Sequence, residues 1–152
     1  MSKLRKIALA CDHAAFEMKE ALKAFLQDRF EILDLGTNTT APVDYPDYAE
    51  KIGQAIMNKQ AERGILLCGS GVGASIAANK IHGIRAGICH DSYSAHQGVE
   101  HDHMNVLVLG ARIIGIELAK ELATEFLNAK ESQEERHLKR LAKVHKLEEG
   151  IR

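Results

Sequence analysis

The chain has 152 residues, 45% of them hydrophobic and 27% charged, with a formal net charge of −1. Such a length and composition are typical of one globular domain with a single core. The near-zero net charge argues against overall attraction to nucleic acid or to an anionic membrane. No apolar run reaches the roughly 18 residues needed to span a bilayer. The apolar run at residues 7–11 is also too short for a signal peptide.

Short aliphatic runs alternate along the chain with segments whose apolar residues recur at helical spacing. The strand-like runs are residues 6–11, 30–36, 64–68, 84–89 and 105–110. The helical segments are residues 14–30, 48–60, the glycine loop to about 81, 92–101 and 115–129, and a loop at 37–47 holds both prolines. This alternation predicts an α/β fold, a three-layer αβα sandwich around a five-stranded parallel sheet, Rossmann-like, with strand order 2-1-3-4-5.

A separate C-terminal helix is predicted at residues 131–150, within a single domain spanning 1–152. Ser132 and Glu135 have the spacing of a capping box. Apolar residues recur along one face of the segment, at Leu138, Leu141 and Leu147. An amphipathic tail of this kind packs on a partner chain, so we expect a homodimer, with a tetramer left open.

Three cysteines, Cys11, Cys68 and Cys89, each end a strand-like run. The number is odd, and no two lie close enough in sequence for a metal clip or a redox pair. This usage predicts reduced thiols and a cytoplasmic protein.

The two stretches richest in reactive side chains follow the first and third strands, as CDH (11–13) and CGSGVG (68–73). In the predicted strand order the sheet changes direction between these two strands. Ligands bind at such a switch point, beyond the carboxyl ends of the strands. Both stretches are therefore expected at one site.

The glycine loop has several interpretations. Gly69, Gly71 and Ala74 match the dinucleotide fingerprint, and Asp91 follows about twenty residues later, where a ribose-binding acid would stand. That fingerprint normally occupies the first strand-to-helix turn, which here has no glycine. The ATP-binding P-loop motif fails, because Ala74 and Ser75 replace its Gly and Lys.

Two further interpretations remain open for the loop. It could be a turn that only lets a helix pack on the sheet. It could instead bind an anion, either a phosphate or a developing oxyanion, with the backbone N–H groups of residues 69–73 at a helix N-terminus.

Cys68 stands at the entrance to this loop. A helix N-terminus favours the thiolate form of a neighbouring cysteine, which could then act as nucleophile or general base, whereas a buried structural cysteine is the alternative. Asp12 could likewise cap a helix or bind a substrate, and His13 follows it directly.

The remaining candidates are histidines and arginines. His96, His101 and His103 lack the spacing of a helical metal pair, so no metal site is expected, but one of them could serve as a general acid or base. Arg112 follows the fifth strand. Arg136 and Arg140 are four residues apart on the tail helix, where two guanidinium groups suit a phosphate or a solvated face.

Together these stretches resemble type B ribose-5-phosphate isomerases, in the family that also holds galactose-6-phosphate isomerase subunits. The matching motifs run through almost the whole chain: CDHAAF (11–16), DYPDYA (44–49), CGSGVGASIAANK (68–80), GIRA (83–86), SYSAHQGVEHDHMNVLVLGAR (92–112) and RHLKR (136–140). The resemblance implies interconversion of ribose 5-phosphate and ribulose 5-phosphate without metal or cofactor. It also implies sites at a dimer interface that draw residues from both chains.

The resemblance implies a role for each matching residue. Cys68 moves a proton between C1 and C2, and His101 assists ring opening. Some members use a glutamate within the loop, but here that position is Ala74. The loop residues Gly69, Ser70, Gly71, Val72 and Gly73 would hold the enediolate oxygen, and the other substrate contacts would be Asp12, His13, Tyr45, Asp102, Arg112, Arg136 and Arg140.

One position departs from the family pattern. The residue after the ring-opening histidine is usually Asn, and here it is Asp102. A carboxylate near a developing enediolate is opposed by like charge. The sequence therefore leaves a six-carbon phosphosugar, allose or galactose 6-phosphate, as the alternative substrate. A non-catalytic NAD-binding module is the alternative of a different class.

Overall fold

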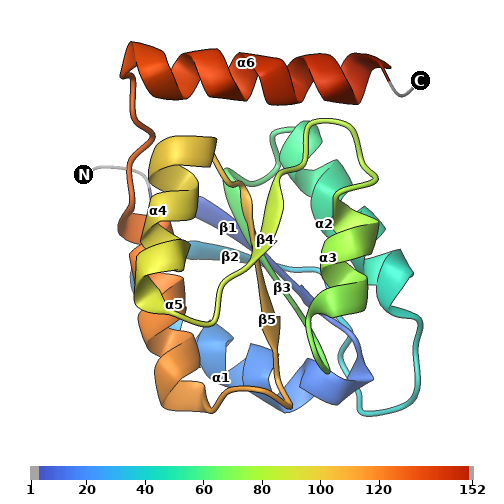
Figure 1. Cartoon of the computed structure of the whole chain (residues 1–152). Coiled ribbons are helices and arrows are strands. Elements are labelled where there is room, and N and C mark those ends of the chain that lie inside the picture. The colour runs from blue at the N-terminus through green and yellow to red at the C-terminus, as the bar shows by residue number, and fades with distance from the viewer. Residues whose placement is uncertain (1–3, 151–152) are drawn as a thin grey trace.

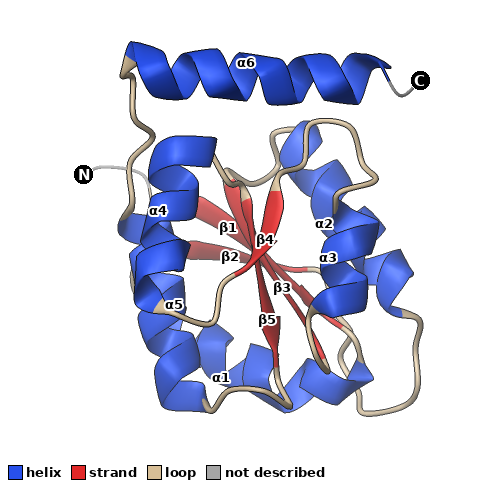
Figure 2. Ribbon diagram, viewed as in Figure 1, coloured by secondary structure: helices blue, strands red, loops and turns tan. Residues whose placement is uncertain are grey.

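The computed structural model describes residues 4–150, so the ends of the predicted 1–152 domain, residues 1–3 and 151–152, lie outside the described part. A parallel sheet forms the middle layer, with helices on both faces (Figure 1; Figure 2). Its strands are β1 (Lys6–Cys11), β2 (Glu31–Asp34), β3 (Arg63–Cys68), β4 (Ala86–Ile88) and β5 (Val106–Gly110). The predicted α/β sandwich with five parallel strands is confirmed.

Three helices cover one face of the sheet and two cover the other. The first face carries α1 (Phe16–Leu26), α4 (Ser92–Asp102) and α5 (Ile116–Asn128), and a short 3-10 turn, η1 (His13–Ala15), precedes α1. The second face carries α2 (Tyr45–Met57) and α3 (Val72–Ala78). A last helix, α6 (Glu135–Gly150), stands apart from both layers at one end of the molecule (Figure 1).

The observed strand order is β2-β1-β3-β5-β4, which exchanges the last two strands of the predicted order. β5 is buried along its whole length, whereas β4 has three residues and is partly exposed. A fully apolar strand suits the interior of a parallel sheet, and a short strand suits its edge. Because of this exchange, the chain runs from β3 out to the edge strand β4 and then returns inward to β5. The helix that connects β4 to β5, α4, therefore lies on the face of the sheet that carries α1 and α5. The switch point between β1 and β3 is unchanged.

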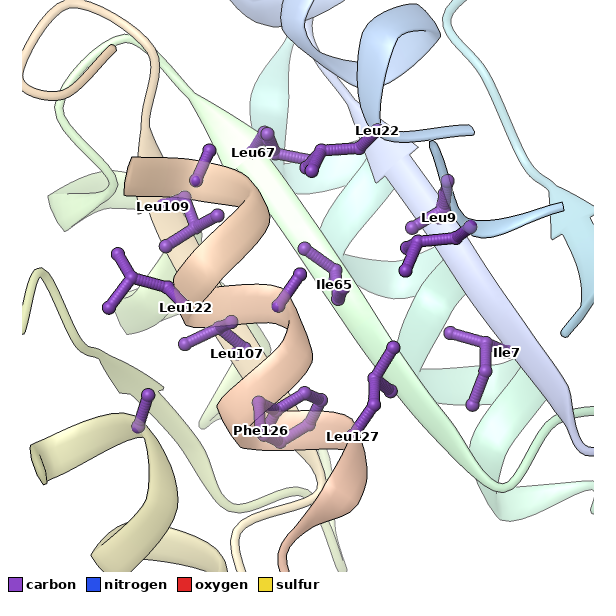
Figure 3. Packing of buried hydrophobic residues seen from close by; sticks show 14 of the residues in the cluster. Ile7, Leu9, Leu22, Ile65, Leu67, Leu107, Leu109, Leu122, Phe126 and Leu127 are labelled. Atoms are coloured by element: carbon purple, nitrogen blue, oxygen red, sulfur yellow. The ribbon is translucent and has the colours of Figure 1, made fainter. Parts of the chain in front are cut away.

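The larger core lies between the sheet and the face made by α1, α4 and α5. Figure 3 shows Leu122 and Phe126 of α5 over Leu107 and Leu109 of β5 and Ile65 of β3. All five side chains are fully buried. Burying each such side chain contributes about 1.5–3 kcal/mol to stability, so the strands that carry the site are held rigidly.

Two helices begin at positions that differ from the prediction. α2 begins at Tyr45 rather than at 48, because Pro46 occupies the first turn, where a missing N–H costs nothing. α6 begins at Glu135 rather than at 131. Ser132 does not form the predicted capping box, since its Oγ accepts a bond from the Glu134 N–H and lies 2.8 Å from His137 Nδ1.

The strands have two ends with different surroundings. At the carboxyl edge, defined by the last residues of the strands, β1 leads to η1 and β3 leads to α3. At the amino edge, where the strands begin, α4 ends and α6 crosses the molecule, opposite the end where α3 begins (Figure 1). Across residues 4–150, none of the helices is both long and apolar enough to cross a membrane.

Candidate active site

Cys68 is the last residue of β3, and the glycine loop folds back over its sulfur. The N–H of Gly71 donates to Cys68 Sγ at 3.2 Å, and the thiol residue is only 4% exposed. Gly71 has φ +86°, a left-handed conformation that a residue with a side chain adopts only under strain. An amide N–H aimed at a sulfur stabilises negative charge on it, so the predicted loop–cysteine pair forms a site suited to a thiolate.

The other two cysteines have a different environment. Burial raises the pKa of the Cys11 thiol to about 11, and burial likewise raises the pKa of Cys89 to about 11. Cys89 Sγ lies against Met104 Sδ at 3.9 Å. Both thiols are therefore protonated at neutral pH, and Cys68 is the cysteine placed for proton transfer.

The loop packs so closely on the neighbouring strand that no side chain fits at Gly110, where the two meet. A Cβ on Gly110 of β5 would lie 2.5 Å from the carbonyl oxygen of Ser70, which is backbone and cannot move alone. Ser70 Oγ accepts a bond from the Val72 N–H at 3.2 Å. The positions of the loop amides are thus set by the neighbouring strand and by the loop's own hydroxyl.

Tyr45 and Arg112 flank the loop on two sides. A Cβ on Gly73 would lie 2.5 Å from Tyr45 Cζ, and one on Gly69 would lie 3.2 Å from Arg112 Nη1. The Arg112 N–H also donates to the Gly69 carbonyl at 2.9 Å. The structure therefore brings both predicted substrate contacts to the glycine loop, and the early start of α2 is what carries Tyr45 there.

Asp12 and His13 follow β1 and lie beside Cys68, as the switch point predicts. The Asp12 N–H donates to the carbonyl of Leu67, the residue before Cys68. Asp12 Oδ1 caps η1 by accepting the Ala14 N–H at 3.0 Å, so the capping interpretation is confirmed. His13 Nδ1 accepts the Val43 N–H at 3.1 Å, which leaves Nε2 to carry the proton of the neutral ring.

His101 lies at the end of α4, with a polar side chain near each of its ring nitrogens. Gln97 Nε2 lies 2.8 Å from its Nδ1, and an amide nitrogen can only donate, so the neutral ring carries its proton on Nε2. Glu100 Oε1 lies 3.4 Å from that Nε2. One face of the His101 ring stacks on the ring of His137, with the ring centroids 4.0 Å apart.

The tail helix adds two arginines and a buried histidine at the same place. Burial, helped by the neighbouring positive charge of Arg136, lowers the pKa of His137, so this ring is neutral at pH 7. Arg136 and Arg140 are exposed on either side of it along α6, and Arg136 Nε donates to Glu134 at 2.8 Å. Their exposure leaves both guanidinium groups accessible to a phosphate.

The predicted residues fall into two groups at opposite edges of the sheet. Cys68 pairs with Gly110 at the carboxyl end of β5. The carbonyl of Asp102 accepts a bond from Arg85 Nε, directly before β4, at the amino edge. The length of β5 separates the two edges, about 16 Å at 3.3 Å per residue. One chain therefore does not bring Cys68 and His101 together.

The other histidines have separate partners. His96 lies 3.1 Å from Glu100 and 3.4 Å from Glu125, whereas His103 Nε2 lies 3.1 Å from the Ser132 carbonyl. Within residues 4–150, no group of three or more His, Cys, Asp or Glu side chains is arranged to hold a metal ion.

The dinucleotide interpretation does not fit the sheet. Asp91 follows β4, which is separated from the glycine loop's own strand by β5. Its carboxylate accepts the Ser94 N–H at 2.7 Å and caps α4. A ribose-binding acid is expected on the strand next to the fingerprint loop, so Asp91 is a helix cap.

Sequence reasoning missed three contributors to these two groups. Gln97 could have been found from its i, i+4 spacing to His101, and His137 from its place between two arginines. His90 Nε2 accepts the Gly110 N–H at 3.0 Å, next to the loop. No motif in the sequence predicts this last contact, although the predicted strand order also makes β4 and β5 neighbours.

Known proteins resemble this chain over most of its length. A family model described as Ribose/Galactose Isomerase matches residues 7–144. Ribose-5-phosphate isomerase B of Escherichia coli is 41% identical over 147 residues, which are 96% of this chain and 98% of that protein. The structure of ribose-5-phosphate isomerase B from Clostridium thermocellum has a TM-score of 0.93 at 39% identity, and covers 97% of this chain and 99% of its own. The structure of ribose-5-phosphate isomerase B from Mycoplasma genitalium, solved with bound ribulose-5-phosphate, has a TM-score of 0.87 at 33% identity. The match covers 95% of this chain and 96% of that protein.

Proposed function

The chain belongs to the ribose/galactose isomerase family, and from that premise we propose that it is an aldose–ketose isomerase interconverting D-ribose 5-phosphate and D-ribulose 5-phosphate. The observation that carries the proposal is the Gly71 N–H aimed at Cys68 Sγ, beside Asp12 and His13. A base next to a cradle of backbone amides is what proton transfer between neighbouring carbons requires.

The proposed reaction starts with the closed furanose. The imidazolium form of His101 gives its Nε2 proton to the ring oxygen, the C1 hydroxyl gives its proton to solvent, and the bond between C1 and the ring oxygen breaks, so that the open aldehyde forms. The Cys68 thiolate then removes the proton from C2, and the electron pair moves to O1, where amides of residues 69–73 stabilise the cis-enediolate. Return of the proton to C1, with transfer of the O2 hydroxyl proton to O1, leaves a hydroxyl at C1 and the ketone at C2. Asp12 orients the sugar hydroxyls.

The phosphate has its own set of cations. Arg112, Arg136 and Arg140 would bind it, with His13 donating from Nε2. Guanidinium groups suit this task because they bind phosphate oxygens in a bidentate manner. The glycine loop is then left for the enediolate oxygen.

The active site is proposed to be shared between two copies of the chain. An acid and a base that act on one small sugar must each lie within about 3 Å of it, whereas the two groups here are about 16 Å apart along the sheet. A two-fold dimer, in which His101, Asp102 and the tail arginines of one copy meet Cys68 of the other, completes two identical sites. Whether two such dimers pair as a tetramer is a separate question.

Exposed apolar side chains beside the loop support this dimer. Val72 and Ile76 lie one turn apart on α3 and are 52% and 57% exposed, and Ile113 beyond β5 is 59% exposed. A Cβ on Gly110 would touch both Ile113 and Ser70, which places Ile113 next to the loop. Large exposed apolar groups around a half-built site mark a surface that a partner covers.

Two inactive variants test function and assembly together. Cys68→Ala and His101→Asn should each abolish most isomerisation of ribose 5-phosphate, assayed with added chelator. Mixed and refolded one to one, they should recover about a quarter of the wild-type rate, because half of the dimers then carry one intact site. Recovery would be absent if each site lay within one chain. A wild-type protein that leaves ribose 5-phosphate unchanged would refute the function itself.

Sugar preference is the second question. Asp102 replaces the expected amide, and its exposed side chain lies at the end of the site that would meet the sugar. A six-carbon phosphosugar, allose or galactose 6-phosphate, is therefore the alternative substrate. The ratio of kcat/KM among these sugars and ribose 5-phosphate decides it, and activity of this chain alone argues against a two-subunit galactose type.

The wider setting is also proposed. Residues 1–152 act as one catalytic domain, with the C-terminal helix completing the partner's site. The reaction belongs to carbohydrate metabolism, in the non-oxidative pentose phosphate pathway. All three cysteines are free thiols, which supports a reducing, cytoplasmic location. Neither a nucleic acid nor a membrane is a proposed partner, and the chemistry uses the chain's own side chains without a cofactor.

A further inference from the structure

Lys19 of α1 has a side chain that is completely buried. Its Nζ lies 2.7 Å from Asp34 Oδ1, 2.8 Å from the carbonyl oxygen of Thr37 and 3.2 Å from Asn38 Oδ1. Glu20 Oε1 is a further carboxylate at 3.2 Å. Burying an ammonium group is costly unless all its donors are satisfied, and a buried pair is weak support for stability alone. The burial of this ammonium group therefore indicates a role beyond packing.

The acceptors of Lys19 tie the segment after β2 to the end of β1. Asp34 Oδ1 also accepts the Gly36 N–H at 3.0 Å. The Gly36 carbonyl accepts the Cys11 N–H at 2.6 Å, and the Thr37 N–H donates to the Cys11 carbonyl at 2.7 Å. The segment is thus fixed beside the residue that precedes Asp12 and His13.

The same segment continues to the imidazole of His13. Residues 39–42 are exposed, and the Ala41 N–H donates a local bond to Thr39 Oγ1. The Val43 N–H then donates to His13 Nδ1 at 3.1 Å. The start of this loop is held by Lys19, and its far end determines which nitrogen of His13 carries the proton.

We propose that Lys19 is a positioning residue for the phosphosugar site. Through the loop of residues 36–43 it orients His13, with Nε2–H directed to the substrate phosphate. This inference rests on the proposed function, because it assigns His13 to phosphate binding. Lys19 itself touches no substrate.

The charge of Lys19 is maintained across the working pH range. Burial by itself lowers the pKa of Lys19, but the bonds to Asp34 and Glu20 outweigh burial and raise the pKa above that of an ordinary lysine. The ammonium therefore holds the loop at any pH at which the enzyme would work.

The matched comparison uses a second lysine on the same carboxylate. Lys23 Nζ donates to Asp34 Oδ2 at 3.1 Å and is 38% exposed, and the loop is not among its contacts. Lys19→Met should raise KM for ribose 5-phosphate about tenfold or more, with a smaller change in kcat, because binding geometry and not the base is disturbed. Lys23→Met should leave both constants within about twofold.

A double variant separates positioning from charge balance. Lys19→Met leaves Asp34 partly buried without its main partner, which lowers thermal stability. Adding Asp34→Asn removes that charge and keeps an oxygen for the Gly36 N–H. We expect stability to recover while the KM defect remains. Recovery of KM together with stability would overturn the proposal, since Lys19 would then serve only to neutralise Asp34.

A spectroscopic readout is independent of activity. The nitrogen-15 shifts of His13, measured without substrate, should show a single Nε2–H tautomer in the wild type and in Lys23→Met. In Lys19→Met the two ring nitrogens should average toward a mixture of tautomers. An unchanged tautomer together with an unchanged KM would overturn the inference. Should the wild type lack isomerase activity, the proposed function fails, but the nitrogen shifts still decide whether Lys19 positions His13.

Discussion

The two edges of the sheet carry the two halves of the proposed site, and they are built by different means. At the carboxyl edge, Cys68 is 4% exposed and is surrounded by backbone, with glycines at each close approach. At the amino edge, the Arg136 side chain is 64% exposed and extends from a helix surface. The first half is organised within one chain. In the proposed dimer, a second copy would displace the water around the charges of the second half, so we expect this half to function only in the assembly.

The largest expected effect comes from removing the base at the carboxyl edge. Cys68→Ala should lower kcat for ribose 5-phosphate by about 10²–10⁴, the range for a general acid or base. Cys89→Ala is the matched control, because its thiol is buried and protonated. Steady-state kinetics with both variants measure the difference, and a near-native rate for Cys68→Ala would remove this residue from the mechanism.

A methyl group on the neighbouring strand should act almost as strongly. In Gly110→Ala the new Cβ meets the Ser70 carbonyl, so the loop amides must shift, and a displacement near 1 Å can cost about 10² in kcat/KM. Gly115→Ala is the control, since a Cβ there meets nothing within 4 Å. Equal kinetics for the two variants would show that the loop tolerates displacement and that its geometry is not the source of the rate.

Removing the acid at the amino edge should have an effect that depends on direction. His101→Asn should slow isomerisation of ribose 5-phosphate by about 10², because its furanose ring must open. Ribulose 5-phosphate has no such ring, so the reverse initial rate should fall much less. His96→Asn on the same helix serves as the control. An equal loss in both directions would assign His101 to proton transfer at carbon rather than to ring opening.

A smaller effect is expected at the unusual carboxylate. Asp102→Asn removes a negative charge near the enediolate and should raise kcat/KM for ribose 5-phosphate by a few-fold, the size of an exposed charge effect of about 1 kcal/mol. Measuring allose 6-phosphate in parallel shows whether Asp102 selects a sugar. A decrease for ribose 5-phosphate would show that the carboxylate itself contacts the substrate.

The smallest effect concerns the two protonated cysteines and appears only in alkali. Their folded pKa of about 11 lies above the usual 9.0, so the folded state keeps its protons longer than the unfolded chain. Their contribution is complete below pH 9 and is lost between pH 9 and 11, at about 2–3 kcal/mol for each thiol. Urea unfolding at pH 8 and pH 10.5 measures how much free energy of unfolding is lost between the two pH values. This loss should be smaller in Cys89→Ala than in the wild type. If the free energy of unfolding depended on pH identically in the two proteins, the Cys89 thiol would titrate in the same way in the folded and unfolded states.

Sequence reasoning predicted the carboxyl edge more fully than the amino edge. Cys68, Asp12 and His13 follow adjacent strands directly, so aliphatic runs and a strand-order rule sufficed to bring them together. His101 ends α4, and the exchange of β4 and β5 determines on which face of the sheet that helix lies. Neither periodicity nor residue spacing specifies which of two short strands takes the edge. The buried Lys19 was missed because a lysine within an amphipathic helix is normally solvated.

The exchange of β4 and β5 has a consequence for the order in which the chain can be assembled during synthesis. Among the described residues, 4–150, β4 pairs only with β5, which is made about twenty residues later, and β3 meanwhile has an open edge on that side. A nascent chain that stops before residue 106 therefore displays an unpaired, apolar strand edge, and such edges promote aggregation. Vectorial folding of this protein must wait for β5, which inserts between two strands that were already made.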